Sequence, residues 1–169
     1  IIGHSTMRKH RKEKTFFEKY WLTALIIIIG IFYLYMLQFS GTLMWDEMVY
    51  LGNARSHVGP SFFNEDFRFP LLELVIGTTW VVFGETILSA QLIMILFSLL
   101  GIYGFALIAR KYLDHKWSAI ATVLFTSSAP LLIWGFRIYT DVPAMTLTIF
   151  ATYFFIKFLI IFFKSFFLR

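Results

Sequence analysis

The sequence contains no cysteine, which excludes disulfide bonds, thiolate nucleophiles and thiolate metal sites. Charge is also scarce: 15% of the 169 residues are charged, whereas 59% are hydrophobic and 20% are aromatic. A soluble domain is usually about 25% charged and about 45–50% apolar. Because this chain has too few polar groups to cover one aqueous core, and its mean hydropathy is +0.74, we expect an integral membrane protein.

Several patterns of known catalytic sites are also missing. The four histidines are scattered along the chain, so the sequence gives no histidine triad for a metal ion. No glycine-rich phosphate loop, nucleophile elbow or zinc-protease helix is present. The carboxylates would permit a divalent metal, but nothing in the sequence requires one, and we predict neither a metal site nor a cofactor.

Long apolar runs define the predicted fold. A bilayer core about 30 Å thick needs roughly 20 apolar residues in a helix. Runs of this length occupy residues 20–39, 86–109, 117–136 and 142–163. We therefore predict an all-α, polytopic protein with about four transmembrane helices. A cleaved signal peptide is the alternative interpretation of the first run, but its apolar stretch would be about 7–15 residues followed by a small-residue cleavage site.

The remaining segments complete the predicted organisation. Residues 1–19 form a basic N-terminus, and residues 20–169 form the membrane domain. Residues 71–83 are apolar apart from Glu73, but 13 residues of helix cover only about 20 Å. We therefore predict an interfacial helix there, within an outer loop over residues 40–85. Because the chain starts at Ile1 and stops soon after the last run, we expect an N-terminal fragment of a longer protein.

The placement of charge predicts the orientation. Lys and Arg accumulate in cytoplasmic loops of membrane proteins. With a cytoplasmic N-terminus and four crossings, 12 of the 15 basic residues lie inside with three acids, and three arginines lie outside with seven acids. The net charge of +5 therefore reflects topology, and we do not expect nucleic acid as a partner. We expect a multi-pass protein of a prokaryotic cell membrane.

The first candidate site residues lie just after the first apolar run. Asp46 and Glu47 are adjacent carboxylates, and in a helix starting near Asp46 the side chain of Tyr50 would share the face of Asp46. The alternative is structural: Asp46 would be a helix N-cap and Glu47 a first-turn acid favoured by the helix dipole.

A second polar cluster, Arg137 to Asp141, lies in the short turn before the last apolar run. Asp141 or Thr140 followed by Pro143 also predicts a helix start, so capping is again the alternative. The predicted topology places Asp46, Glu47 and Asp141 on the same side of the membrane as Arg55, Arg68 and Arg137. Arginines suit a phosphate, and a carboxylate can act as a general base on a hydroxyl. For Arg55 and Arg68, simple balancing of nearby acids is the alternative.

The order of these motifs resembles the membrane glycosyltransferases of the GT-C fold, in the branch that includes protein O-mannosyltransferases and the aminoarabinose transferases of lipid A. The resemblance covers roughly residues 20–160. Its motifs are Asp46-Glu47-Met48-Val49-Tyr50, Arg68-Phe69-Pro70-Leu71, Phe83-Gly84-Glu85, Ala109-Arg110-Lys111-Tyr112-Leu113, Ser128-Ala129-Pro130-Leu131 and Arg137-Ile138-Tyr139-Thr140-Asp141. Such enzymes often have His-Pro-Pro or Arg-Pro-Pro at the proline motif, where Phe69 intervenes here.

The resemblance implies transfer of a sugar from a polyprenyl-phosphate carrier to a protein or glycolipid acceptor on the outer side, with inversion. It implies that Asp46 takes the acceptor proton, that Glu47 supports it and that Asp141 helps to place acceptor or sugar. Arg68 and Arg137 are the candidates for the phosphate, and Tyr50 and Arg55 complete the predicted substrate-binding set.

A non-catalytic membrane subunit or transporter fragment is the alternative function. The middle of each apolar run lacks charge, which argues against an ion or proton path, because transporters usually keep ionisable groups there.

Overall fold

The computed structural model describes residues 16–60 and 70–167, and in these ranges every regular element is a helix. The predicted all-α class is therefore confirmed. The elements are α1 (Phe16–Met36), the short 3-10 helix η1 (Leu37–Phe39), α2 (Trp45–Ser56), α3 (Leu71–Phe83), α4 (Ile87–Tyr112), α5 (His115–Thr126), α6 (Ala129–Trp134) and α7 (Asp141–Phe167).

Among the described residues, three helices are long and apolar enough to cross a membrane. They are Glu18–Phe39, Ile87–Tyr112 and Asp141–Phe166, which overlap three of the four predicted runs. The shorter apolar helix α3 occupies the range 71–83 in which the sequence predicts an interfacial helix.

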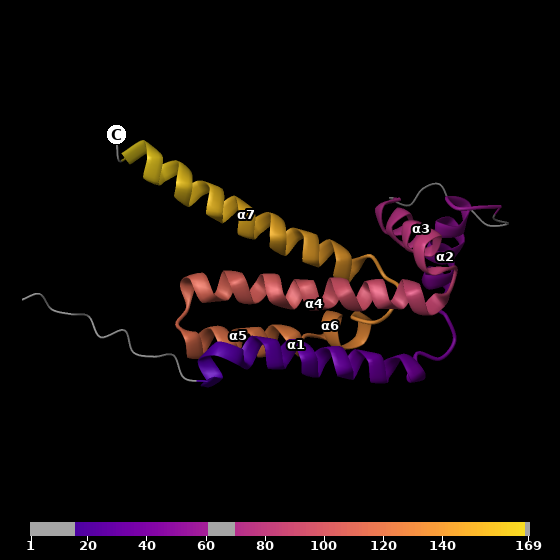
Figure 1. The fold of residues 1–169 in the computed structure, drawn as a ribbon, viewed down its shortest axis with the longest axis horizontal. Coiled ribbons are helices and arrows are strands. Elements are labelled where there is room, and N and C mark those ends of the chain that lie inside the picture. Colours follow the sequence, from indigo (N-terminus) through magenta and orange to yellow (C-terminus); the bar gives the residue numbers. More distant parts are fainter. Residues whose placement is uncertain (1–15, 61–69, 168–169) are drawn as a thin grey trace, which may run out of the picture.

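The fourth predicted run, residues 117–136, is not one continuous helix. It forms α5 and α6, with a break at Ser127 and Ser128. Pro130 explains the break, because a continuous helix would need its missing N–H to donate to the carbonyl of Thr126, and its ring would clash with that carbonyl. The side chain of Thr126, at the end of α5, donates its hydroxyl to the carbonyl of Thr122 at 2.7 Å, a contact that often bends a helix. Figure 1 shows α5 and α6 together running beside α4 in the opposite direction.

Small and hydroxyl side chains bring the long helices close together. Gly101 of α4 faces Thr146 of α7 so closely that a Cβ atom would lie 2.6 Å from Oγ1 of Thr146. The fully buried Tyr33 of α1 donates its hydroxyl to the carbonyl of Leu131 in α6 at 2.9 Å. Ser98 of α4 donates to the carbonyl of Gly135 at 2.5 Å. These contacts fix the position of the turn between α6 and α7, which carries the second polar cluster.

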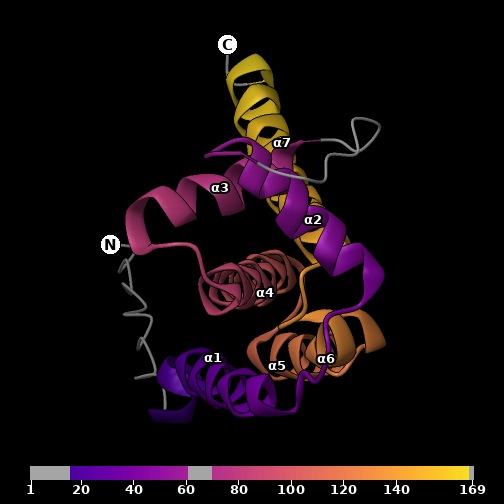
Figure 2. The same ribbon diagram turned by 90° about the vertical axis from the view of Figure 1, so that its right-hand side faces the viewer.

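One end of the bundle gathers α2, α3, the start of α4 and the start of α7 (Figure 1). Figure 2 looks onto this end, where α2 crosses obliquely from the side of α6 toward α3. We call it the α2 end. The opposite end holds the last turn of α4, with Arg110 and Lys111, and the start of α5. All five candidate site residues in α2 and the α6–α7 turn therefore lie at one end of the molecule.

Candidate functional site

Glu47 and Arg137 form a buried ion pair that joins α2 to the α6–α7 turn. The Glu47 side chain is fully buried, and the Arg137 side chain is only 11% exposed. Arg137 donates through Nε to Oε1 of Glu47 at 2.9 Å and through Nη2 to Oε2 at 2.5 Å. Such a two-point contact fixes both position and orientation. We call this pair the Glu47–Arg137 clasp.

Backbone groups satisfy the rest of the clasp. Glu47 accepts from the backbone N–H of Met44 at 2.9 Å and of Ile138 at 3.1 Å. Arg137 also donates to the carbonyls of Ser40 at 2.6 Å and Thr42 at 3.4 Å. Glu47 therefore has no oxygen left for a proton transfer, and the donors of Arg137 are engaged within the protein. The geometry suits both residues to positioning.

Asp46 lies beside the clasp on a different face of α2. The N-cap of α2 is Met44, so Asp46 stands in the first turn and is not the capping residue considered from the sequence. Its side chain is half-buried. Tyr50, one turn further on, is buried, and its hydroxyl oxygen lies 3.3 Å from Oγ1 of Thr140. Tyr50 thus connects this part of α2 to Thr140, the residue just before α7.

Asp141 is the first residue of α7 and is exposed. The backbone N–H of Ala144 donates to the carbonyl of Thr140 at 2.9 Å, so the helix begins where the Thr140-Asp141-Val142-Pro143 pattern predicts. We call Asp46, Tyr50, Tyr139, Thr140 and Asp141, which come from α2, the α6–α7 turn and the first residue of α7, the carboxylate site.

Tyr139 belongs to this site and was not singled out as a site residue from the sequence. Burial raises the pKa of its hydroxyl, and the negative charges of Glu47 and Asp46 add to the effect. Its hydroxyl donates to the Sδ atom of Met44 at 3.0 Å, and its ring packs on Trp134 with centroids 4.7 Å apart. The Arg137-Ile138-Tyr139-Thr140-Asp141 motif was the signal that could have identified it.

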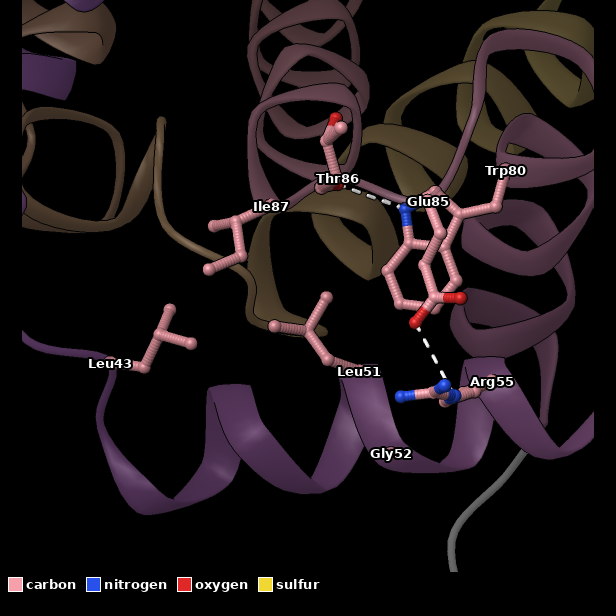
Figure 3. Close-up of a pocket in the computed structure, with 8 residues that line it drawn as sticks. All are labelled: Leu43, Leu51, Gly52, Arg55, Trp80, Glu85, Thr86 and Ile87. Carbon is pink, nitrogen blue, oxygen red and sulfur yellow. Dashed lines mark hydrogen bonds and ion pairs between the residues drawn. The ribbon is translucent and has the colours of Figure 1, made fainter. Parts of the chain in front are cut away.

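Arg55 does not join the carboxylate site. Nine residues of helix separate it from Asp46, and at about 100° a residue this places the two on opposite faces of α2. Its Nε lies 3.4 Å from Oε1 of Glu85, and both side chains are about half-exposed. As Figure 3 shows, this ion pair borders a cavity of about 240 Å³ whose walls include Leu51, Trp80 and Ile87. Arg68 lies outside the described residues.

A further polar cluster, which was not identified from the sequence, holds α3 against α2. Glu73 of α3 is buried and accepts from Nδ2 of Asn53 at 2.7 Å, and Nε2 of His57 lies 3.9 Å from its other oxygen. Asn53 lies in α2, and His57, four residues later, is the C-cap of that helix. The lone acid in an otherwise apolar α3 was the signal for their partner. The described ranges contain no group of three or more His, Cys, Asp or Glu residues placed to hold a metal ion.

The comparison with protein families identifies the chain. The family model described as dolichyl-phosphate-mannose-protein mannosyltransferase matches residues 68–164, which is more than half of the sequence. The chain belongs to this family. No curated protein and no solved structure matches it. The predicted GT-C mannosyltransferase-like relationship is therefore confirmed.

Membership in the mannosyltransferase family implies a membrane glycosyltransferase that uses a polyprenyl-phosphate sugar donor. The matched range includes Arg137, Tyr139 and Asp141, whereas α2 with Asp46 and Glu47 precedes it. The clasp connects these two parts of the chain, so the family-matched turn and α2 form one structural unit.

Proposed function

We propose that the protein transfers a sugar from a polyprenyl-phosphate carrier to a hydroxyl group of a protein or glycolipid acceptor, with inversion. Family membership supports the donor class. The observation that carries the reaction is the half-buried Asp46 carboxylate in the first turn of α2, which the Glu47–Arg137 clasp and the Tyr50–Thr140 contact join to the α6–α7 turn. A carboxylate at hydrogen-bond reach of an acceptor hydroxyl is the group that such a reaction needs.

The proposed step is a direct displacement at the anomeric carbon. The acceptor oxygen forms a bond to that carbon while its proton passes to the Asp46 carboxylate. The bond from the anomeric carbon to the phosphate oxygen breaks, and polyprenyl phosphate leaves with the bonding electron pair. A phosphate is a good leaving group, so one base and nearby cations suffice. Attack from the side opposite the leaving group inverts the anomeric configuration.

The supporting residues take different roles. Asp141, exposed at the start of α7, orients the acceptor or the sugar, and Tyr50 holds the Thr140 side of the site against α2. Glu47 and Arg137 position Asp46 rather than contacting the phosphate, because their hydrogen bonds lie within the protein. Arg68 remains the proposed cation for the phosphate of the carrier, and Arg55 remains in the proposed substrate-binding set. The surface pair of Arg55 with Glu85 contributes only about 0–1 kcal/mol, so a substrate group can replace Glu85 at little cost.

The α2 end is the extracytoplasmic side in this proposal. Five described acids stand there: two in α2, one in α3, one in the loop between α3 and α4, and one at the start of α7. The opposite end carries Arg110, Lys111 and Lys116. Basic residues favour the cytoplasmic side, which supports acceptors outside the cell.

The decisive experiment is Asp46→Asn in the membrane-embedded protein, assayed for transfer from polyprenyl-phosphate mannose. Loss of a general base lowers rates by about 10²–10⁴-fold, so we expect turnover to fall in that range while membrane insertion stays intact. Asp114→Asn is the matched control, because it removes a carboxylate at the opposite end, where Asp114 caps α5. Asparagine still caps a helix, so this control should keep normal turnover.

Unchanged transfer by Asp46→Asn would exclude the assignment of the base. Absence of transfer by the wild-type protein, with normal insertion, would favour the non-catalytic membrane subunit.

A further inference from the structure

The hydroxyl group of Tyr139 is a hydrogen-bond donor in the carboxylate site, and its acceptor in the structure is a weak one. Its hydroxyl donates to the Sδ atom of Met44 at 3.0 Å, and no other acceptor for it is found among the described residues. Thioether sulfur is a weak acceptor, and Met44 is itself 47% exposed. The hydroxyl therefore loses little when a stronger oxygen acceptor replaces the sulfur.

The ring of Tyr139, in contrast, is held firmly. It packs on Trp134 with a centroid distance of 4.7 Å and an interplanar angle of 57°. Its backbone N–H donates to the carbonyl of Arg137 at 3.0 Å. Its neighbours Arg137 and Thr140 both contact α2, through Glu47 and Tyr50. The hydroxyl can thus change its acceptor at little cost while its position stays fixed, as a preorganised binding site requires.

The local charge selects the kind of acceptor. Burial, with the negative charges of Glu47 and Asp46, raises the pKa of Tyr139 and keeps the phenol neutral at working pH. Arg137 acts on this pKa in the opposite direction, but its guanidinium is paired with Glu47, and the pKa of Tyr139 is raised on balance. A phosphate at this hydroxyl would be repelled by Asp46, whereas a neutral sugar hydroxyl would not.

We propose that Tyr139 contacts the substrate by donating its hydroxyl hydrogen to a hydroxyl oxygen of the transferred sugar, in place of Met44. The Tyr139 and Trp134 rings then border the apolar face of that sugar, because aromatic side chains combine an apolar body with a polar handle. This inference rests on the proposed function and deepens it, because it assigns the part of the donor that this site recognises.

The test compares two lipids in binding to the full protein in lipid nanodiscs, without acceptor. The probes are polyprenyl-phosphate mannose and polyprenyl phosphate without the sugar. For Tyr139→Phe, which keeps the ring on Trp134, we expect about 5- to 10-fold weaker binding of the sugar-bearing lipid, as for one neutral hydrogen bond. Binding of polyprenyl phosphate should not change.

Two further variants separate this contact from structural effects. Tyr35→Phe removes a hydroxyl from an exposed tyrosine of α1 and should bind both lipids normally. Met44→Leu removes the sulfur acceptor but keeps apolar bulk, and it should not weaken binding of the sugar-bearing lipid. Equal weakening of both lipids by Tyr139→Phe, or no weakening of either, would overturn the inference alone. Failure of the wild-type protein to bind either lipid would overturn the proposed function and the inference together.

Discussion

At the scale of single residues, adjacent side chains take opposite roles. Asp46 and Glu47 are neighbours with the same charge, yet Glu47 is fully buried and accepts four hydrogen bonds, whereas Asp46 is half-buried one turn before Tyr50. About 100° of helix rotation separates them, so the two side chains leave α2 in different directions, and Glu47 pairs with Arg137. Asp46, the partly exposed member of the pair, is therefore the one that we expect to contact a substrate.

The clasp gives a prediction at this scale. Glu47→Gln leaves Arg137 nearly buried without its counter-charge, and breaking a buried pair from one side costs about 3–5 kcal/mol. We expect a clear fall in thermal unfolding temperature and in transfer. Glu85→Gln is the control, because it breaks an exposed pair with Arg55 worth about 0–1 kcal/mol. Equal stability of the two variants, measured by thermal unfolding in the same detergent, would contradict a structural role for the clasp.

At the scale of elements, α2 is held at both ends by polar contacts. The clasp fixes its first turn to the α6–α7 turn, and Asn53 with His57 fixes its last turns to Glu73 of α3. Close backbone contact reinforces the second attachment, since a Cβ atom on Gly77 would lie 3.0 Å from the carbonyl oxygen of Ala54. The orientation of α2, and with it the position of Asp46, depends on both attachments.

The second attachment is testable by Asn53→Ala. This change removes the amide donor to the buried carboxylate of Glu73, a contact worth about 1.5–3 kcal/mol. We expect hydrogen-exchange protection in α3 to fall by at least tenfold while α4 and α7 keep theirs. Ser56→Ala, which removes a local bond from its hydroxyl to the carbonyl of Asn53, should leave α3 unchanged. The same protection of α3 in both variants would show that Asn53 does not hold it.

At the scale of the whole molecule, charge and structure separate the two ends. Tyr139, Asp46 and Asp141 lie at the α2 end, whereas Arg110 and Lys111 close α4 at the other end. Three helices long enough to cross a membrane connect the ends. In the proposed orientation, the two ends therefore face opposite sides of the membrane.

The absence of cysteine permits a direct test of this orientation. Gly59→Cys introduces a thiol after α2 at an exposed position where an added Cβ meets nothing within 4 Å, and Lys111→Cys introduces one at the exposed end of α4. A membrane-impermeant maleimide should label the first in intact cells and the second only after permeabilisation. The reverse pattern would place the carboxylate site on the cytoplasmic side.

The sequence predicted those parts of the fold that depend on local patterns. Apolar length gave the three long helices and the range of α3, and the Thr140–Pro143 pattern gave the start of α7. The run over residues 117–136 was judged by apolarity alone, and the break caused by Pro130 was therefore missed. Arg55 was grouped with the other outer arginines because the distribution of charge predicts only the side of the membrane on which a residue lies. It does not predict which residues on that side are in contact.

The sequence by itself thus determined the class, the family resemblance and the acids worth attention, because hydropathy, charge bias and motif order are local properties of the chain. Tertiary structure decided which of these residues meet. The pairings of Glu47 with Arg137, Tyr50 with Thr140, and Asn53 with Glu73 join residues 90, 90 and 20 positions apart. No local pattern specifies such contacts, because they arise only when packed helices bring their ends together.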